Sequence, residues 1–421
     1  MTLPDSARRL LRWGLVRWAR GRGAIGALPE PKVYFLLMHA WSMGGTVRTT
    51  MNTASHLARS HDVEVLGVMR TRDSPFFGFP PGVTVTPIDD RRLGVRRGRL
   101  RRALESQPSV LFPQADARMR KCTLWTDVML ARTLRSRRAG VLIGTRPGLN
   151  LLAADVAAPT LVKIGQEHMH FSAHRPRLRK AIRRGYPKLD AVAVLTETDR
   201  AEYAARLGSS VRVEHIPNAV SELGGAMPDL TAKTVLAAGR LMRQKDFGRL
   251  IRAFAIVAER HPDWQLRICG GGPRRRGLAK LIANLGLGDQ VTLAGPVQDL
   301  GAEMAKASMY ALSSRREGFP MVLLEAMGKG LPAVSFDCPT GPREIVVDRE
   351  NGLLVPHQDV KALAAAINEM IEDDELRRRC GAGARATAER YTLPVVGARW
   401  DELVAELSPR AAQASRSSAS H

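Results

Sequence analysis

Two glutamates, Glu317 and Glu325, stand eight residues apart in a segment that reads SRREGFPMVLLEA. Glu317 lies in a short loop after a strand-like run, and Glu325 lies inside a helix expected to start at Phe319–Pro320. Proline suits a first helical turn because its missing N–H would have no partner there. The free amides at this helix start, those of Met321 and Val322, favour an anion. The pattern therefore predicts a bound diphosphate, with a carboxylate on either side to accept hydrogen bonds from hydroxyl groups.

Two cations, Arg240 and Lys245, bracket a second loop, in the segment VLAAGRLMRQKDFGRLIRAF. A strand-like run ends just before Arg240, and Asp246 is expected to be the N-cap of the helix that follows. Both cations then lie at the carboxyl end of a strand. Two fixed positive charges there could neutralise a diphosphate and stabilise it as a leaving group. The alternative is a pair of surface cations without a ligand.

The C-terminal half resembles the family-4 retaining glycosyltransferases (GT-B fold, glycosyl transferases group 1) over nearly its whole length. The shared motifs are GRLMRQK, ICGGGP, LAGPV, the Glu-x7-Glu segment and NGLLVP. The resemblance implies that Arg240 and Lys245 contact the donor diphosphate. It implies that Glu317 contacts the transferred sugar and Glu325 the ribose. The further donor contacts that it implies come from Gly318, Phe319, Pro320, Met321 and Val322 around the phosphates, and from Val297 at the base. The segment FDCPTGPREI also recurs in the family, and the sequence predicts only a tight Pro/Gly loop for it.

The N-terminal half resembles the family less closely. Gly44 and Gly45 follow the first strand-like run, where glycines let the backbone approach a ligand closely. The resemblance implies a histidine near the transferred sugar, and His168 stands at that point. Glu167 and His170 are rival candidates, and a purely structural histidine is a further alternative.

Short apolar runs alternate with amphipathic stretches from residue 32 to about 390, which predicts parallel βαβ units. The predicted strands are 33–38, 63–68, 83–88, 160–164, 191–195 and 211–216 in a first series, and 235–238, 265–269, 291–293, 309–313, 332–336 and 352–355 in a second. Two series predict two doubly wound domains. With the resemblance, the expected fold is α/β of the GT-B type, two Rossmann-like domains facing each other across a cleft.

The expected segments follow from these runs and from composition. They are a basic amphipathic segment (1–28), an acceptor-side domain (29–216), a linker (217–229), a nucleotide-sugar-binding domain (230–391), a helix crossing back to the first domain (392–408) and a disordered tail (409–421).

The positive charge is concentrated in the first half. Residues 1–218 hold 37 Lys and Arg against 17 Asp and Glu, so they carry +20 of the net +23. Such asymmetry points to an anionic partner, with a solvated arginine-rich surface as the alternative. The stretches Arg91–Arg102 and Arg175–Lys188 contain no acidic residue and are the patches expected at that surface. Aromatic residues make up only 5% and no binding module is recognisable, so no nucleic acid is expected as a partner.

Residues 5–20 place Ala7, Leu10, Leu11, Leu15 and Trp18 near one helical face, with arginines largely elsewhere. Such a helix suits either an anionic membrane interface or the protein's own body. No apolar run reaches the roughly 18 residues of a membrane span. Because no run reads as a signal peptide and the four cysteines are scattered, we expect a cytoplasmic protein with reduced thiols. Peripheral attachment to the inner face of the cell membrane is an extension of this interpretation.

The resulting hypothesis is a retaining glycosyltransferase. It would transfer a hexose or N-acetylhexosamine from a nucleotide-diphosphate sugar, UDP being the family's commonest base. The expected acceptor is a cell-envelope molecule, either a polyol-phosphate polymer of the teichoic type or a lipid-linked glycan. No Asp-x-Asp stands in either donor motif, so no metal and no cofactor beyond the donor are expected. The alternatives are a small soluble acceptor, or a nucleic-acid- or sugar-binding protein without catalysis.

Overall fold

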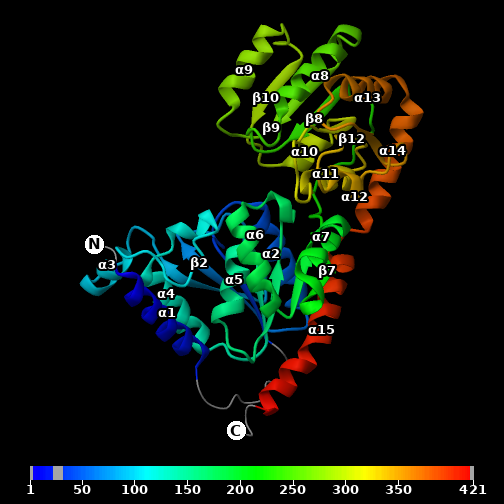
Figure 1. Cartoon of the computed structure of the whole chain (residues 1–421). Helices are drawn as coiled ribbons and strands as arrows, with labels where there is room; N and C mark the ends of the chain where they lie inside the picture. Colours follow the sequence, from blue (N-terminus) through cyan, green and yellow to red (C-terminus); the bar gives the residue numbers. More distant parts are fainter. Residues whose placement is uncertain (1–2, 22–31, 418–421) are drawn as a thin grey trace. The chain divides into compact units, whose positions relative to one another are not determined.

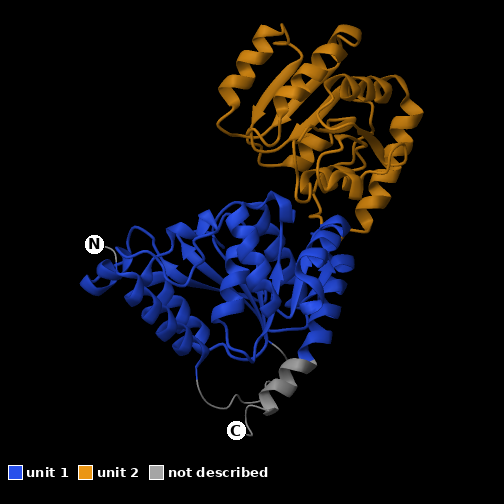
Figure 2. Cartoon of the chain, viewed as in Figure 1, with its two compact units in different colours: residues 1–219, 393–421 blue, residues 220–392 orange. Residues whose placement is uncertain are grey.

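The computed structural model describes residues 3–21 and 32–417, with side chains described as far as residue 408. The chain forms two compact units (Figure 2). Unit 1 comprises Met1–Ala219 and Leu393–His421, and unit 2 comprises Val220–Thr392. Each unit is built on its own parallel sheet (Figure 1). The prediction of two Rossmann-like α/β domains is therefore confirmed.

The sheet of unit 1 has the strand order β3-β2-β1-β4-β5-β6-β7. Its strands are β1 (Val33–Leu37), β2 (Val63–Arg70), β3 (Val83–Asp90), β4 (Val141–Gly144), β5 (Val162–Gln166), β6 (Ala191–Val194) and β7 (Arg212–His215). Its helices are α1 (Asp5–Arg20), α2 (Gly45–Leu57), α3 (Arg99–Glu105), α4 (Leu124–Arg135), α5 (Pro147–Val156), α6 (Pro176–Gly185), α7 (Glu197–Leu207) and α15 (Leu393–Ser417).

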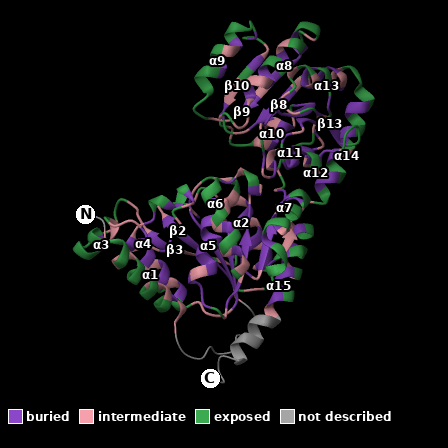
Figure 3. Ribbon diagram, in the orientation of Figure 1, coloured by how far each residue is buried: buried purple, intermediate pink, exposed green. Residues whose placement is uncertain are grey.

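Both faces of this sheet are covered by helices, because successive side chains of a strand point to opposite faces. In β1, Val33 and Phe35 pack with α2 and α15 on one face. Tyr34 and Leu36 pack with α1, α4 and α5 on the other. Figure 3 shows the result, with strands largely buried and helices exposing one side.

The first series of predicted strands lacked β4, which lies beside β1 at the centre of the sheet. Its four residues, VLIG, are all buried. A run this short resembles many loop segments. The Gly before it and the Pro soon after it are boundary signals that could have identified a buried strand.

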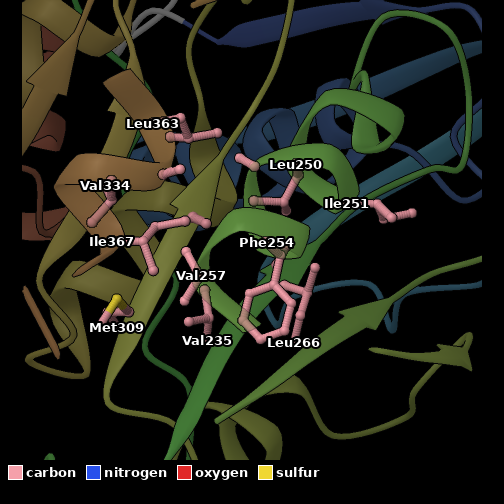
Figure 4. Close-up of a cluster of buried hydrophobic side chains, with 14 of the residues drawn as sticks. Val235, Leu250, Ile251, Phe254, Val257, Leu266, Met309, Val334, Leu363 and Ile367 are labelled. Atoms are coloured by element: carbon pink, nitrogen blue, oxygen red, sulfur yellow. The ribbon is translucent and has the colours of Figure 1, made fainter. Parts of the chain in front are cut away.

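The sheet of unit 2 has the order β10-β9-β8-β11-β12-β13. Its strands are β8 (Thr234–Ala238), β9 (Gln265–Cys269), β10 (Val291–Gly295), β11 (Met309–Leu312), β12 (Ala333–Phe336) and β13 (Gly352–Val355). Its helices are α8 (Phe247–Arg260), α9 (Arg275–Asn284), α10 (Leu300–Met304), α11 (Met321–Gly328), α12 (Pro342–Ile345), α13 (Val360–Glu372) and α14 (Asp374–Glu389). Figure 4 shows its core, in which Phe254 and Val257 of α8 join Val235 of β8 and Ile367 of α13.

Strand order reverses direction between β1 and β4 in unit 1 and between β8 and β11 in unit 2. The loops after two such strands diverge to opposite faces of the sheet and leave a crevice where ligands of doubly wound folds bind. In unit 2 the loops at this point are residues 239–246 and 313–320, the two segments singled out in the sequence.

The expected linker, 217–229, is divided by the unit boundary after Ala219. Its later residues belong to unit 2, because the buried ammonium of Lys329 donates to the carbonyls of Gly224 (3.2 Å) and Gly225 (2.8 Å). The Gly-Gly pair predicted a linker. The contact with Lys329, which is distant in the sequence, could not be read from the residues around that pair.

The C-terminal helix α15 belongs to unit 1 and packs on α2. There His56 Nε2 lies 2.7 Å from Asp401 Oδ2. The helix extends to Ser417, so much of the segment 409–421, which we expected to be disordered, is helical in backbone. Alanines at 411, 412 and 414 favour helix and explain the extension. Residues 418–421 lie outside the described residues.

Helix α1 packs on the body of unit 1, against α4 and α5. Ala19 is fully buried, and Arg12 donates to the carbonyl of Val110 and pairs with Asp155 at 2.8 Å. Of the two interpretations of this helix, packing on the protein is therefore observed. Among the described residues, no helix combines the length and the apolar character needed to cross a membrane.

Candidate functional site

The switch point of unit 2 brings Lys245 and Glu317 together. Lys245 Nζ lies 2.7 Å from Glu317 Oε1, and the pair is largely withdrawn from solvent. Ser314 Oγ donates to the same oxygen at 2.5 Å. Because Oε1 is occupied by these donors, Oε2 is the oxygen able to accept a bond from a ligand hydroxyl.

The two loops are also joined through their backbones. Arg315 N donates to Gln244 O at 2.8 Å, and Ser313 Oγ donates to Lys245 O at 3.0 Å. Beneath them the hydroxyl of the buried Tyr310 donates to Ala238 O at 3.0 Å, at the end of β8. Lys245 and Glu317 therefore sit on a fixed frame and not on independent loops.

Glycines permit a third loop to approach the first. Gly270 has φ +144°, and a Cβ there would lie 1.9 Å from Gly239 O. A Cβ on Gly272 would lie 2.5 Å from Leu241 O. The ICGGGP motif therefore packs against the residues on either side of Arg240, Gly239 and Leu241. This packing fixes the backbone position of Arg240. The Arg240 side chain is exposed and makes no ion pair or hydrogen bond with a described residue, so it is available to an anion.

The start of α11 departs from the expectation in one respect. The Met321 amide donates to Phe319 O at 2.9 Å, so it does not point free into the crevice. Pro320 sits at the N-cap position with ψ 77°, a conformation that turns the chain back on itself. The Val322 amide has no backbone partner in the described chain and remains available for an anion. Phe319 is buried, with its ring 5.7 Å from that of Tyr391.

The FDCPTGPREI segment acquires a role in the structure. Gly341 has φ +88°, and a Cβ there would meet Pro320 Cδ at 2.7 Å. Thr340 Oγ1 donates to Glu317 O at 2.5 Å. This loop therefore holds the Glu317 backbone and the start of α11, a tertiary role that local sequence does not display.

Three other predicted donor residues line the same end of the sheet. Glu325 is buried within α11, with 5% of its surface exposed. Gly318 lies between Glu317 and Phe319 in the loop before that helix. Val297 is half-buried and follows Pro296, whose ring lies against Gly271 of the ICGGGP motif.

In unit 1 the predicted glycines lie at the start of α2. Gly44 is its N-cap residue, and a Cβ on Gly45 would meet nothing within 4 Å. The space next to the Gly45 Cα is therefore not filled by any group of the described chain, and the start of α2 is open there.

The structure separates His168 from its two rivals. Glu167 is buried, and its Oε1 accepts from Tyr186 Oη and from Asn150 Nδ2 at 3.0 Å. His170 is held between two acids, as described next. His168 Nε2, by contrast, is inaccessible to solvent and has no hydrogen-bond partner in the described chain.

The two histidines differ in charge state as well. His170 Nδ1 lies 2.7 Å from Asp199 and Nε2 lies 2.9 Å from Glu202. The hydrogen bond to Asp199 raises the pKa of His170. Burial, with a smaller effect of the Arg146 charge, lowers the pKa of His168 to about 4. His168 is therefore a neutral imidazole at physiological pH.

Sequence reasoning missed a second histidine of this sheet edge. His39 follows β1, and burial together with the charge of Lys121 lowers its pKa. Arg146 and Arg118 contribute in the same direction, so three cations surround it. The only sequence signal was its place directly after a buried strand, in the same loop as Gly44.

The two basic patches differ from each other in the structure. In Arg91–Arg102, Arg91 and Arg101 pair with the buried Asp89, and Arg92 pairs with Asp90. Part of this patch is therefore internal structure, a correction to the expectation, whereas Arg96, Arg99 and Arg102 are exposed and have no ion pair with a described residue. The acids that pair with it flank the stretch, Asp89 and Asp90 before it and Glu105 after it, so its boundaries excluded them.

The second patch is free. Helix α6 buries Leu178 and Ile182, and its cations project from the other side. The cations without an ion pair to a described residue are Arg175, Arg177, Arg179, Lys180, Arg183 and Arg184.

Similarity to known proteins identifies the family of this chain. A family model described as glycosyl transferases group 1 matches residues 227–387. A GDP-mannose-dependent alpha-(1-6)-phosphatidylinositol monomannoside mannosyltransferase of Mycolicibacterium smegmatis is 30% identical over 278 residues, which are 61% of this chain and 72% of the relative. The chain belongs to the group 1 glycosyltransferases. The prediction of a glycosyltransferase is thereby confirmed, and the assignment to family 4 stays a prediction.

Two further matches extend the comparison. An exopolysaccharide phosphotransferase of Streptomyces coelicolor is 39% identical over 394 residues, which are 90% of this chain. The chain spans only 41% of that relative's length. A crystal structure of S. aureus TarM with Fondaparinux, alpha-GlcNAc-glycerol and UDP has a TM-score of 0.70 and 15% identity, covering 89% of this chain and 100% of TarM. At that identity the likeness supports the GT-B fold alone.

For this glycosyltransferase we predict that His168 stays neutral down to about pH 4. A folded-state pKa below the ordinary 6.5 means that the unfolded chain binds the proton more readily. The stability contribution of His168 is therefore full above about pH 6.5 and is lost as the pH falls toward 4. NMR titration of the imidazoles should show one resonance titrating near 4 that is missing from His168→Gln.

Urea unfolding gives the matching control. Wild type should lose more stability than His168→Gln between pH 7 and 5, because the variant lacks the imidazole whose pKa differs between the folded and unfolded chain. A His168 resonance titrating near 6.5 would contradict the burial argument.

Proposed function

We propose that the chain is a retaining glycosyltransferase that transfers a hexose or N-acetylhexosamine from a UDP-sugar to a phosphate-containing acceptor of the cell envelope. The acceptor is a polyol-phosphate polymer of the teichoic type or a lipid-linked glycan. The observation that carries the proposal is the Lys245–Glu317 pair at the switch point of unit 2, 2.7 Å apart, with the exposed side chain of Arg240 in the same loop as Lys245.

The arrangement supports separate roles for the residues that bind the diphosphate and those that bind the sugar and the ribose. Arg240, Lys245 and the Val322 amide bind the donor diphosphate and stabilise the charge that develops on it. Glu317, through its free Oε2, accepts from a hydroxyl of the transferred sugar, and Glu325 accepts from the ribose. Gly318, Phe319, Pro320, Val297, Gly44 and Gly45 shape the donor's surroundings.

The proposed chemistry is a front-face displacement. The bond from the sugar C1 to the donor phosphate oxygen breaks while a bond from the acceptor oxygen to C1 forms on the same face. The acceptor's proton passes to the leaving phosphate oxygen, so atoms and charge balance without a metal. His168, neutral and without an internal partner, is available to hold the sugar by a hydrogen bond.

The choice of donor and acceptor rests on relatives and on charge. The TarM crystals contain UDP, whereas the mycobacterial relative is named for GDP-mannose, so the base must be tested. The mycobacterial relative is named for phosphatidylinositol monomannoside and the Streptomyces relative for an exopolysaccharide, which favours an envelope glycan as the acceptor. The free cations of α6, which follows the loop that carries His168, favour an anionic acceptor over a neutral one.

Donor hydrolysis tests the site. UDP-, GDP- and ADP-sugars are screened with wild type and with the Glu317→Ala and Lys245→Ala variants. One donor should turn over. Each variant should lose about 10²-fold or more in kcat, Lys245→Ala because it removes a charge that stabilises the leaving diphosphate, and Glu317→Ala because it removes the acceptor of a sugar hydroxyl and the ion-pair partner of Lys245. Glu350→Ala and Lys361→Ala, both exposed, serve as controls. Donor turnover that survives both site substitutions would contradict the proposed roles.

The acceptor class is tested on α6. The variant Lys180→Glu/Arg184→Glu reverses two exposed cations one turn apart, and it should weaken binding of synthetic poly(glycerol phosphate) about tenfold while donor hydrolysis is unchanged. Arg59→Glu/Arg132→Glu reverses two exposed cations elsewhere in unit 1 and should have little effect. Unchanged binding by the α6 variant, with no salt dependence in wild type, would favour the small soluble acceptor.

Membrane association is proposed on narrower grounds. Leu10 and Trp13 of α1 are 71% and 62% exposed, and Arg17 stacks on Trp13 at 5.2 Å, so an apolar and basic strip faces away from the core. Deleting the helix would uncover the core around Ala19. The variant Leu10→Glu/Trp13→Glu should instead abolish flotation with vesicles rich in anionic lipid and leave unfolding unchanged. Equal flotation of both proteins, or flotation of neither, would refute this attachment.

A further inference from the structure

A cavity of about 780 Å³ lies in unit 2 between α8 and α9, and it is not lined by Arg240, Lys245, Glu317 or Glu325. Gly248 of α8, Gly277 of α9 and Val360 are among the residues that line it. Its walls are strongly basic. Six cations line it: Arg243, Arg249, Arg252, Arg274, Lys280 and Arg315.

These charges are poorly compensated from within the protein. Asp246 is the single acid that lines the cavity, and it pairs with Arg249 and with Arg315 at 2.8 Å. Arg252 donates to the Gly248 carbonyl at 3.1 Å. Arg243, Arg274 and Lys280 are exposed and have no ion pair with a described residue. Clustered like charges repel one another, so an anion in the cavity would be stabilised by several of them at once.

The start of α8 adds to this field. Asp246 occupies the N-cap position, as expected from the sequence, but its side chain makes no capping bond. It is in the left-handed conformation (φ 47°, ψ 40°), and its carboxylate is bound by arginines instead. The first amides of this 14-residue helix therefore lack a side-chain cap at the edge of the cavity.

We propose that this cavity binds a ligand carrying several phosphate groups in a row, either a free oligophosphate or a phosphodiester chain. The cations are spread over two helices and three loops, which suits several phosphates better than one. Arginine forks bind phosphate oxygens in pairs, and five of the six cations are arginine. Binding here is independent of sugar transfer and can be measured without turnover.

The cavity and the donor site share one loop. Within residues 240–246, Lys245 contacts Glu317 while the next residue, Asp246, faces the cavity. Arg315 of the cavity stands two residues before Glu317. An oligophosphate could therefore also enter the donor site, and the test must separate the two.

The test is calorimetric titration with tripolyphosphate. Wild type should bind it, and Arg252→Glu/Lys280→Glu should weaken binding about tenfold or more, because two phosphate contacts become repulsive. Arg252→Gln/Lys280→Gln should weaken it less. The Lys245→Ala variant should retain the cavity's binding, since Lys245 does not line it.

Controls and a second probe complete the design. Arg379→Glu/Arg385→Glu makes the same change of charge on exposed residues of α14 and should bind as wild type. Tighter binding of synthetic poly(glycerol phosphate) per phosphate identifies a chain as the ligand, and weaker binding identifies a free oligophosphate. The proposal fails if Arg252→Glu/Lys280→Glu binds as wild type, if the α14 variant is weakened equally, or if Lys245→Ala abolishes binding.

Discussion

The ion pair between Lys245 and Glu317 is the interaction on which the proposed donor site depends. Its partners come from loops 72 positions apart that become neighbours because β8 and β11 are adjacent at the point where strand order reverses. Ser314 binds the same carboxylate oxygen, and Thr340 holds the backbone of Glu317. A carboxylate held in this way keeps one oxygen for a ligand, and it costs little reorganisation when the ligand arrives. The glycines of three loops serve the same end, since bulkier residues would force those loops apart.

The meeting of Lys245 and Glu317 at one edge of the sheet could be predicted because its determinants are local. Each partner follows a short buried strand, and parallel strands of a doubly wound sheet bring their carboxyl ends to one edge. What it did not predict depends on partners distant in the chain. The Met321 amide is occupied by Phe319 O only because Pro320 turns the backbone there. Strand β4 is too short to show a period, and the carbonyls of residues 224 and 225 are fixed by a lysine about a hundred positions away.

Among the features of the sequence, net charge was the weakest guide to which surfaces of the folded protein carry free charge. The count over residues 1–218 was correct, but it did not distinguish arginines that hold the fold from those that face solvent. Arg101 is nearly buried beside Asp89, whereas Arg183 and Arg184 on α6 are exposed and unpaired in the described chain. The count also assigned little charge to the C-terminal half as a whole, yet six cations line a single cavity there. Local charge, set by where acids fall in space, decides which surface attracts an anion.

The histidines of unit 1 bear on where the acceptor's proton goes. A general base works best when its pKa lies near the working pH. His168 has a pKa of about 4 and is a weak base, while Glu167 is committed to Tyr186 and Asn150 and His170 to two acids. None of the three sequence candidates is therefore suited to remove a proton from a hydroxyl. This is the condition under which a leaving diphosphate, which gains negative charge as the sugar departs, becomes the better acceptor of that proton. The low pKa of His168 fits its proposed role in binding, since a neutral imidazole can hydrogen-bond to a sugar without opposing the positive charge that would develop at C1.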